Sequence, residues 1–268
     1  MNEQQPTSID TQWANTPLQN EREPFARNTL FIAATHGNEG FSIPVLEKLE
    51  REYPKKQFGY NWTIGNRKAL SANRRYTESD LNRSAPGNLK SPLFEERRAA
   101  QLMDISNDFD TVIDIHGTTA DVGICTIIPY PSLQNILFSS VLPIKNNVIW
   151  YAEESLVKGP ITQFCKQPAL EIECGPKDSP IIATQLFDVL EKSLSGMQAM
   201  DPLQWCQSIE KKEYFQVYGS LPGRIDDLVN FQQYSLGDES FFPFLANQYS
   251  DIACFKMKRL SLPEVWMY

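Results

Sequence analysis

Short apolar runs alternate with amphipathic segments through the first 200 residues of the chain. The runs have the length and composition of buried strands and lie at 28–35, 60–65, 111–116, 124–128, 147–151 and 169–174. The segments between them carry apolar residues at the spacing of one helix face and lie at 40–52, 93–106, 134–142 and 180–197. This alternation predicts an α/β fold with a mixed or mostly parallel central sheet flanked by helices.

The pattern changes near residue 200. Short strand-like runs separated by turn residues follow, and they lie at 214–217, 241–245 and 252–257. We therefore expect a small β-rich C-terminal domain after the main α/β domain, preceded by a polar, flexible N-terminal arm that contains three prolines. The expected boundaries are 1–27 for the arm, 28–200 for the main domain and 201–268 for the C-terminal domain.

The segment 66–87 interrupts the alternation. It is rich in Arg, Asn and Ser and has no apolar periodicity. A loop of this length inside a compact domain is usually functional or disordered. Two interpretations stay open: a solvated charged loop, or a loop whose arginines, Arg75 and Arg83 among them, bind a substrate carboxylate and polarise a carbonyl group.

Composition and charge exclude several classes of protein. The chain has 268 residues, of which 41% are hydrophobic and 22% charged, as in ordinary globular proteins. Its net charge of −8 argues against sequence-independent nucleic-acid binding, which needs a basic surface. The chain has neither an apolar signal core nor an apolar run long enough to cross a membrane. The five cysteines are scattered and form no CxxC pair, so we expect a reduced, cytoplasmic environment.

The chain contains only two histidines, and each follows an apolar run. His36 lies three residues before Glu39 at the end of the first run, and His116 closes the run at 111–116. Ligands bind at the carboxyl ends of strands in open α/β sheets. Two imidazoles, one carboxylate and an open fourth position form the ligand set of a catalytic zinc site. We therefore expect His36, Glu39 and His116 to bind one metal ion, for which zinc is the best match.

Three further carboxylates lie within the predicted strands. Asp114 shares a strand face with His116, and it either orients that imidazole or fills a buried hydrogen-bonding role. Glu171 and Glu173 share a face of the run at 169–174, where burial of charge is costly without a partner. Glu173 ends the run and is placed to act as a general base beside a metal-activated water. Glu171, further back, is expected to pair with a basic residue.

Four motifs occur in an order that identifies a family. They are His36-Gly37-Asn38-Glu39, Arg75-Tyr76 with Asp80-Leu81-Asn82-Arg83, Asp114-Ile115-His116-Gly117-Thr118-Thr119, and Ile172-Glu173-Cys174-Gly175-Pro176. In this order the chain resembles the succinylglutamate desuccinylase/aspartoacylase family of the zinc carboxypeptidase superfamily. The resemblance runs from about residue 28 to 258 and includes Gly237-Asp238, Phe242-Pro243-Phe244 and Tyr249. Four ordered motifs are specific, whereas any one alone would be weak.

The resemblance implies a carboxypeptidase-like catalytic domain over 28–200 and assigns a role to each matched residue. His36, Glu39 and His116 would bind one Zn²⁺ per chain. Glu173 would be the general base that activates the attacking water and the acid that protonates the leaving amine. Arg75 would polarise the scissile carbonyl and stabilise the oxyanion.

The resemblance also implies residues that bind the substrate. Asn82 and Arg83 would hold the carboxylate of the amino-acid half. Tyr249 would reach in from the C-terminal part and bind the far end of the substrate. The substrate would then be a small anionic N-acyl amino acid, with no nucleic-acid or membrane partner.

One position departs from the aspartoacylase pattern. Aspartoacylases carry an arginine ten residues before the catalytic glutamate, where it helps to bind a second carboxylate; this chain has Gln163 there. Lys158 and Lys166 are the nearby cations that could replace it, but a lysine lacks the planar, two-pronged geometry of a guanidinium. The departure weakens any expectation that the substrate is N-acetylaspartate.

The expected function is therefore zinc-dependent hydrolysis of the amide bond of an N-acyl amino acid. Two alternatives use the same ligands: carboxypeptidase-type hydrolysis of a short peptide, and metal binding without catalysis. The presence of Glu173 and Arg75 beside three metal ligands counts against the last. The acyl group and the amino acid stay open, as does the oligomeric state, for which a homo-oligomer is one option.

Overall fold

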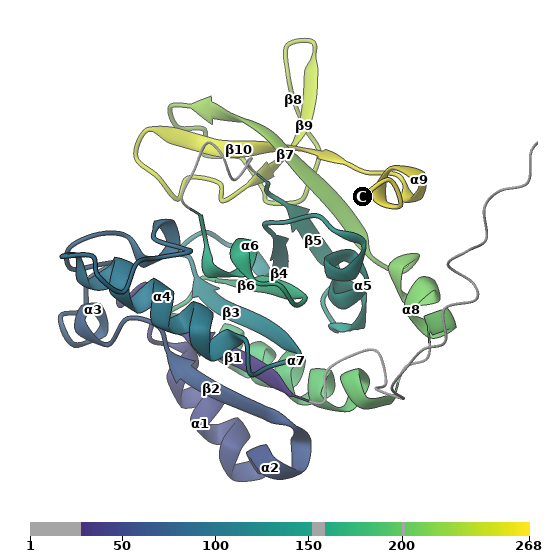
Figure 1. Cartoon of the computed structure of the whole chain (residues 1–268). Helices are drawn as coiled ribbons and strands as arrows, with labels where there is room; N and C mark the ends of the chain where they lie inside the picture. Colours follow the sequence, from purple (N-terminus) through teal and green to yellow (C-terminus); the bar gives the residue numbers. More distant parts are fainter. Residues whose placement is uncertain (1–27, 152–158, 200–201) are drawn as a thin grey trace, which may run out of the picture.

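The computed structural model describes residues 28–151, 159–199 and 202–268, so the predictions for the arm at 1–27 and for Lys158 fall outside the described residues. Within the described residues, ten strands form a sheet in the order β2-β1-β3-β6-β4-β5-β7-β10-β9-β8 (Figure 1). The strands are β1 (Thr29–Ala33), β2 (Tyr60–Ile64), β3 (Thr111–Gly117), β4 (Gly123–Ile128), β5 (Asn146–Ile149), β6 (Ala169–Gly175), β7 (Glu213–Pro222), β8 (Tyr234–Leu236), β9 (Glu239–Phe244) and β10 (Ile252–Arg259). The helices are α1 (Ser42–Glu52), α2 (Lys55–Phe58), α3 (Arg67–Ser71), the 3₁₀ helix η2 (Leu81–Arg83), α4 (Phe94–Ser106), α5 (Leu133–Val141), α6 (Ile161–Phe164), α7 (Pro180–Ala199), α8 (Pro202–Ile209) and α9 (Leu262–Val265).

The sheet is mixed. Strand β1 lies between β2 and β3, parallel to both, and β3 pairs in parallel with β6. Strand β4 is antiparallel to β6, whereas β5 is parallel to both β4 and β7. The prediction of an α/β fold with a mixed central sheet flanked by helices is therefore confirmed.

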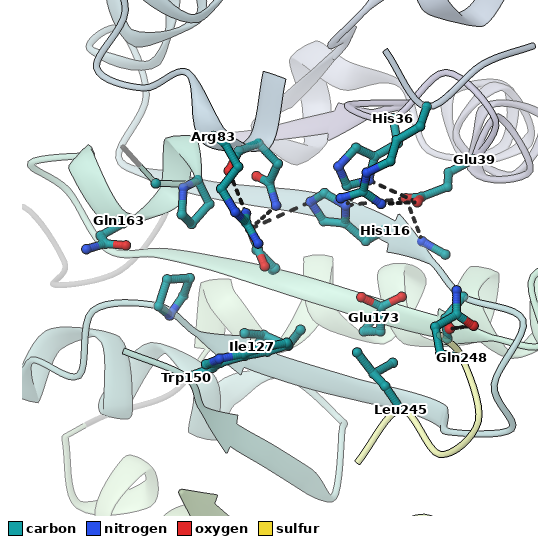
Figure 2. A pocket seen from close by; sticks show the side chains of 18 of the residues that line it. His36, Glu39, Arg83, His116, Ile127, Trp150, Gln163, Glu173, Leu245 and Gln248 are labelled. Carbon is teal, nitrogen blue, oxygen red and sulfur yellow. Dashed lines mark hydrogen bonds and ion pairs between the residues drawn. The ribbon is translucent and has the colours of Figure 1, made fainter. Parts of the chain in front are cut away.

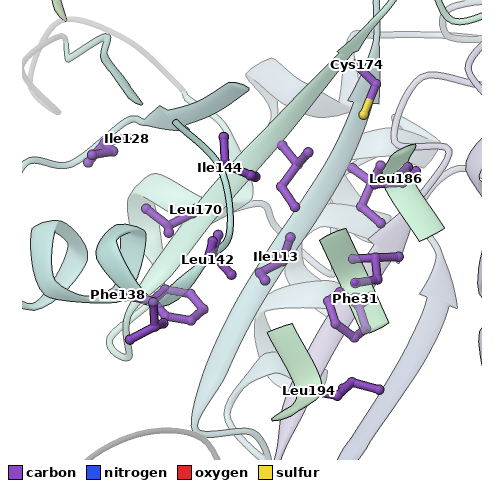
Figure 3. Close-up of a cluster of buried hydrophobic side chains, with 14 of the residues drawn as sticks. Phe31, Ile113, Ile128, Phe138, Leu142, Ile144, Leu170, Cys174, Leu186 and Leu194 are labelled. Carbon is purple, nitrogen blue, oxygen red and sulfur yellow. The ribbon is translucent and has the colours of Figure 1, made fainter. Parts of the chain in front are cut away.

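The central strands are buried on both faces, as their uninterrupted apolar runs predict. Alternate residues of β1 show this directly, because Phe31 and Ala33 join one hydrophobic cluster while Leu30 and Ile32 join another. The first cluster packs the sheet against α1, α5 and α7 (Figure 3). The second packs the opposite face against α4, α6 and η2. Each fully buried Leu, Ile or Phe contributes about 1.5–3 kcal/mol to stability, so this double layer holds the strand ends in place.

The segment 66–87 contains the helices α3 and η2, where the sequence predicted an unstructured loop. Both helices are capped by side chains: Asn66 Oδ1 accepts a hydrogen bond from the Ala69 amide (3.0 Å) and Asp80 Oδ1 accepts one from the Asn82 amide (2.9 Å). Each helix is three to five residues long and buries only one or two of them. Helices this short show no hydrophobic period, which is why the pattern missed them.

The strands of the predicted C-terminal domain extend the main sheet. Strand β7 pairs in parallel with β5, where Asn147 lies opposite Tyr214, and β10, β9 and β8 follow in antiparallel order. Helix α8, which the sequence pattern did not predict, precedes β7. The expected boundary at residues 200 and 201 falls among residues outside the described part, so the division into domains stays a prediction.

Two further observations bear on the expected class of protein. All five cysteines are free thiols, as their scattered positions suggest. Within the described part of the chain, none of the helices combines the length and apolar character needed to cross a bilayer.

Candidate active site

A cavity of about 240 Å³ opens at the carboxyl ends of β1, β3 and β6 (Figure 2). Because β1 and β3 are parallel neighbours, and β3 and β6 are too, all three strands end at the same edge of the sheet. The cavity is lined by every site residue predicted from the sequence, namely His36, Glu39, Arg75, Asn82, Arg83, His116, Glu173 and Tyr249.

The turn after β1 points His36 and Glu39 in one direction. The Glu39 amide donates a hydrogen bond to the His36 carbonyl (3.0 Å), and His36 Nδ1 lies 2.9 Å from Glu39 Oε1. Gly37 between them packs against the backbone of α3, and a Cβ there would lie 2.0 Å from the Ala69 carbonyl carbon. A residue other than glycine at position 37 would therefore push this turn away from α3.

His116 completes the group from the end of β3. Its Nδ1 lies 3.3 Å from His36 Nδ1 and 3.3 Å from Glu39 Oε2. One ligand atom from each of the three side chains lies within 4.8 Å of the other two. All three side chains are buried, so their nitrogen and carboxylate atoms are enclosed and directed toward one point, as a metal ion requires.

The second nitrogen of each imidazole faces a carboxylate. His116 Nε2 lies 3.0 Å from Asp114 Oδ2, and His36 Nε2 lies 3.3 Å from Asp80 Oδ1. The Thr35 hydroxyl donates to both oxygens of Asp114, at 2.8 and 2.9 Å, and fixes that carboxylate. A proton on Nε2 shared with these carboxylates leaves Nδ1 free to coordinate a metal, the arrangement common behind metal-bound histidines.

The charge of this buried group favours a cation. Burial lowers the pKa of His116, but Asp114 and Glu171 outweigh it and raise that pKa well above its ordinary value. In the same way, burial opposes ionisation of Glu39, yet the two imidazoles hold the pKa of its carboxyl far below the usual range. The negative charge of these carboxylates favours a positive charge on the neighbouring imidazoles. The same negative charge would favour a divalent cation bound between the side chains. The donor set therefore fits the expected metal.

The contact of Asp114 with His116 was among the roles expected from the sequence, whereas the contact of Asp80 with His36 was not. Of the two roles left open for Asp114, the structure has it contact His116 directly. Asp80 was only part of a motif, and its contact with His36 was not predicted. No sequence signal could have found this pair, since 44 residues separate the two side chains.

Glu173 lies on β6 opposite His116 of β3 in the strand register. Its carboxyl faces the cavity, and burial together with the Glu39 charge raises its pKa to about 8. Glu171 lies opposite Asp114, two residues further from the strand end. Its Oε1 is 3.4 Å from Asn82 Nδ2 and 3.7 Å from His116 Nε2, so its basic neighbour is an imidazole.

The segment from the end of α3 through η2 brings three of the predicted site residues, Arg75, Asn82 and Arg83, to the cavity. Arg75 Nε donates to Asp80 Oδ2 (3.0 Å), and its terminal nitrogen lies 4.0 Å from Glu39 Oε1. Asn82 is buried, and its Oδ1 has no hydrogen-bond partner among the described residues. Arg83 Nη1 donates a hydrogen bond to the Asn82 carbonyl (2.7 Å), but Arg83 forms no ion pair with any described residue, so its other N–H groups are available to a ligand.

Glu95 on α4 holds this segment in place, a role that the sequence did not indicate. The side chain is fully buried, and its carboxylate accepts hydrogen bonds from the Thr77 amide (2.8 Å), the Thr77 hydroxyl (2.6 Å) and the Ser79 amide (3.2 Å). Asn66 Nδ2 donates to it as well (3.2 Å). This one buried carboxylate thus attaches Asn66, before α3, and Thr77 and Ser79, before η2, to helix α4. Arg75 lies between these two points of attachment.

Tyr249 and Gln248 approach the cavity from the segment after β9. The Tyr249 ring is 41% exposed and packs edge-on against Phe255. Gln248 Oε1 accepts hydrogen bonds from the Thr118 hydroxyl (2.7 Å) and from the Thr119 amide (3.0 Å) and hydroxyl (2.6 Å). The loop after His116 is therefore attached to the segment that presents Tyr249.

The position at which aspartoacylases carry a substrate-binding arginine lies in the wall of the cavity. Gln163 on α6 is buried and lines the cavity. Lys166 is exposed and is not among the lining residues, whereas Lys158 lies outside the described residues. Within the described part of the chain, nothing in the cavity replaces the arginine with another cation.

Residues 26–179, more than half of the chain, match the model of the succinylglutamate desuccinylase/aspartoacylase catalytic domain. The chain belongs to the succinylglutamate desuccinylase/aspartoacylase family. All three expected metal ligands, Glu173 and the predicted substrate residues except Tyr249 lie within the matched region.

Relatives within this family carry two kinds of name. A probable aspartoacylase of Acaryochloris marina is 28% identical over 192 residues, which cover 66% of this chain and 64% of the relative. An N-acyl-aromatic-L-amino acid amidohydrolase (carboxylate-forming) of Danio rerio is 32% identical over 193 residues, which cover 60% of this chain and 58% of the relative. In both cases the match spans less than two thirds of the relative's own length.

Solved structures share the fold over most of the chain. Murine aminoacylase 3 has a TM-score of 0.63 at 18% identity and covers 89% of this chain and 97% of its own. The succinylglutamate desuccinylase of Chromobacterium violaceum has a TM-score of 0.64 at 17% identity, and the match covers 89% of this chain and 86% of the desuccinylase. At these identities the similarity concerns the fold alone.

Proposed function

We propose that this chain is a zinc-dependent hydrolase that cleaves the amide bond of a small N-acyl amino acid and releases a carboxylic acid and an amine. The observation that carries the proposal is the convergence of His36, Glu39 and His116 in one cavity with Glu173 and Arg75. Relatives named as aspartoacylases and as N-acyl-aromatic-L-amino acid amidohydrolases support the reaction class.

His36, Glu39 and His116 would hold one metal ion per chain. Two nitrogens and one carboxylate oxygen suit zinc better than they suit calcium or magnesium, which prefer oxygen ligands. When bound, zinc supplies a Lewis acid and makes a water molecule more acidic. Asp114 and Asp80 would orient the imidazoles by accepting a hydrogen bond from each Nε2–H group.

The remaining residues would move protons and bind charge. Glu173 would take a proton from the attacking water and deliver it to the nitrogen of the leaving amine. The Arg75 guanidinium would donate hydrogen bonds to the carbonyl oxygen as negative charge develops there. Asn82 and Arg83 would bind the substrate carboxylate, and Tyr249 would cover the far end of the substrate.

The test combines metal analysis with hydrolysis assays on the full chain. We expect one equivalent of zinc, hydrolysis of N-acetyl amino acids, and little hydrolysis of dipeptides. Glu173→Ala should keep its metal while kcat falls by about 100-fold or more, because a positioned acid–base group contributes at least that much. Glu47→Ala, at an exposed position of α1, is the matched control and should keep both its metal and its kcat.

Three outcomes would contradict parts of this proposal. Normal turnover by Glu173→Ala would remove Glu173 from the mechanism. Preferential cleavage of dipeptides would favour the carboxypeptidase alternative. A protein that binds zinc and hydrolyses neither class would be a metal-binding protein without catalysis.

A further inference from the structure

The cavity wall that faces Arg83 is apolar. It consists of Ile127 on β4, Trp150 after β5 and Leu245 after β9. Figure 2 shows Ile127 and Trp150 on one side of the cavity and Arg83 on the other. Such a wall strengthens binding only if the ligand buries an apolar group against it.

The indole ring of Trp150 is held in a fixed orientation. Its centroid lies 4.4 Å from that of Phe255 and 5.8 Å from that of Phe244, the latter at an interplanar angle of 79°. Aromatic pairs at these separations are favourable beyond the area that they bury. Because its orientation is set before a ligand arrives, Trp150 offers a rigid flat surface at little entropic cost.

Positive charge in the cavity is sufficient for one substrate carboxylate. Among the described lining residues, Arg75 and Arg83 are the permanent cations. Arg75 already donates a hydrogen bond to Asp80 and lies 4.0 Å from Glu39, so Arg83 is the cation that is left to bind a carboxylate. A second carboxylate on the substrate would have no such partner among the described residues that line the cavity.

At the end of the cavity near Gln163 the described lining residues are uncharged, whereas the metal end holds several carboxyl groups. Gln163, which lies beyond Trp150 in Figure 2, is buried and neutral. The cavity is also lined by three carboxyl groups, those of Glu39, Glu171 and Glu173. A dicarboxylic substrate would lose its hydration here without gaining a matching cation from the described residues, which is strongly unfavourable.

We propose, on the basis of the deacylase function above, that the cavity selects N-acyl amino acids with a large apolar side chain. The side chain packs on Trp150 and Ile127, while the α-carboxylate binds Arg83 and Asn82. Trp150 and Gln163 are then the residues that determine specificity. Trp150 provides the apolar contact, and the neutral Gln163 stands where an acidic substrate side chain would need a cation.

The first experiment compares N-acetylphenylalanine, N-acetylleucine and N-acetylaspartate as substrates of the zinc-loaded full chain. We expect kcat/KM to be at least about tenfold higher for the two apolar substrates, in line with the discrimination that an apolar pocket provides. Equal or better hydrolysis of N-acetylaspartate would overturn the inference while leaving the deacylase function intact.

A binding measurement decides the inference even if no substrate is hydrolysed. Calorimetric titration of the Glu173→Ala protein with the same three compounds reports binding without turnover. Tighter binding of N-acetylphenylalanine supports the inference whether or not the chain proves to be a deacylase. Equal or tighter binding of N-acetylaspartate contradicts it, so failure of the inference and failure of the proposed function are distinguishable.

Two variants test the residues separately. Trp150→Ala should raise KM for N-acetylphenylalanine by about tenfold and leave KM for N-acetylalanine nearly unchanged. Trp150→Phe should bring KM for N-acetylphenylalanine most of the way back to the native value. Gln163→Arg should improve kcat/KM for N-acetylaspartate relative to N-acetylphenylalanine. Gln185→Arg adds the same charge on the exposed face of α7 and should not change the ratio. Unchanged ratios in both cavity variants would exclude these residues as determinants of specificity.

Discussion

Each imidazole of the site has a carboxylate behind it, and this pairing decides which ring nitrogen faces the cavity. The Asp114 carboxylate is fully buried and bonded to both Thr35 and His116. Its negative charge makes the imidazole a better ligand and fixes the ring orientation. We therefore expect the affinity for metal to depend on residues that do not contact the ion.

Replacement of Asp114 by asparagine tests this dependence. Asp114→Asn keeps the shape of the side chain and removes its charge, so the affinity for zinc should fall by about 10–100-fold. Competition with a chromophoric chelator measures the change. Asp178→Asn, at an exposed position, is the control and should bind zinc normally. Equal affinity in both variants would mean that Asp114 is only a structural hydrogen-bonding group.

Arg83 allows a second test at the same scale. We expect Arg83→Ala to raise KM for an N-acyl amino acid by about 10–100-fold, because one charge-assisted contact is lost. The value of kcat should change little, since Arg83 binds the carboxylate in both the ground state and the transition state. Steady-state kinetics separate the two constants, with the exposed Arg74→Ala as control. An unchanged KM would remove Arg83 from the substrate site.

At the scale of elements, the segment from α3 through η2, which carries Arg75, Asn82 and Arg83, depends on α4. The segment has no hydrophobic core of its own. Its hydrogen bonds to Glu95 therefore hold it in one conformation. Burial would raise the pKa of Glu95, but the hydrogen bonds from Thr77, Asn66 and Ser79 outweigh it and hold that pKa below its usual value. The segment is therefore most stable when Glu95 is ionised.

Replacement of Glu95 by glutamine should loosen the segment. We expect Glu95→Gln to destabilise the chain by about 1–3 kcal/mol and to raise KM more than it lowers kcat, because Arg83 and Asn82 lose their support. Denaturant unfolding and kinetics measure the two effects. Glu47→Gln, at an exposed position of α1, is the control. A stability loss with no change in KM would make Glu95 a structural residue only.

The same contact predicts a dependence on pH. Since the folded-state pKa of Glu95 is depressed, its contribution is complete above the unfolded-state pKa of about 4.3 and is lost as pH falls through the lower folded-state value. The native chain should therefore lose more stability than Glu95→Gln when the pH drops below about 4. Parallel slopes of unfolding free energy against pH would contradict this.

At the scale of the whole molecule, the cavity is assembled from two parts of the chain that are distant in sequence. The ends of β1, β3 and β6 supply the three proposed metal ligands and Glu173, whereas the segment after β9 supplies Leu245, Gln248 and Tyr249. Gln248 links the two parts through its hydrogen bonds to Thr118 and Thr119. Closure of the cavity therefore requires the C-terminal strands to be folded onto the sheet.

Loss of this link should weaken substrate binding without affecting the metal. Gln248→Ala should leave zinc binding unchanged and raise KM by about tenfold, because Tyr249 and the loop after His116 are no longer attached to each other. Metal analysis and kinetics measure the two properties. Gln233→Ala, at an exposed position, is the control. Loss of zinc in Gln248→Ala would mean that the link supports the metal ligands as well.

Much of this site could be read from the sequence because its residues stand at the ends of strongly patterned strands. His116 and Glu173 each close a buried apolar run, and parallel strands bring such ends to one edge. The family resemblance added Arg75 and Asn82, which no periodicity marks. The short helices α3 and η2 were missed, because they are stabilised by caps and by Glu95 and not by an apolar face.

The sequence by itself determined the strand–helix alternation, the faces of the strands and the kinds of side chain at their ends, since these follow from local spacing along the chain. Only the tertiary structure decided that Asp80 lies behind His36, that Glu95 holds the segment from α3 through η2, and that Trp150 and Leu245 form one apolar wall. These contacts join residues that are far apart in sequence. Their distances depend on how the sheet, α4 and the C-terminal strands pack together, and no local pattern records that packing.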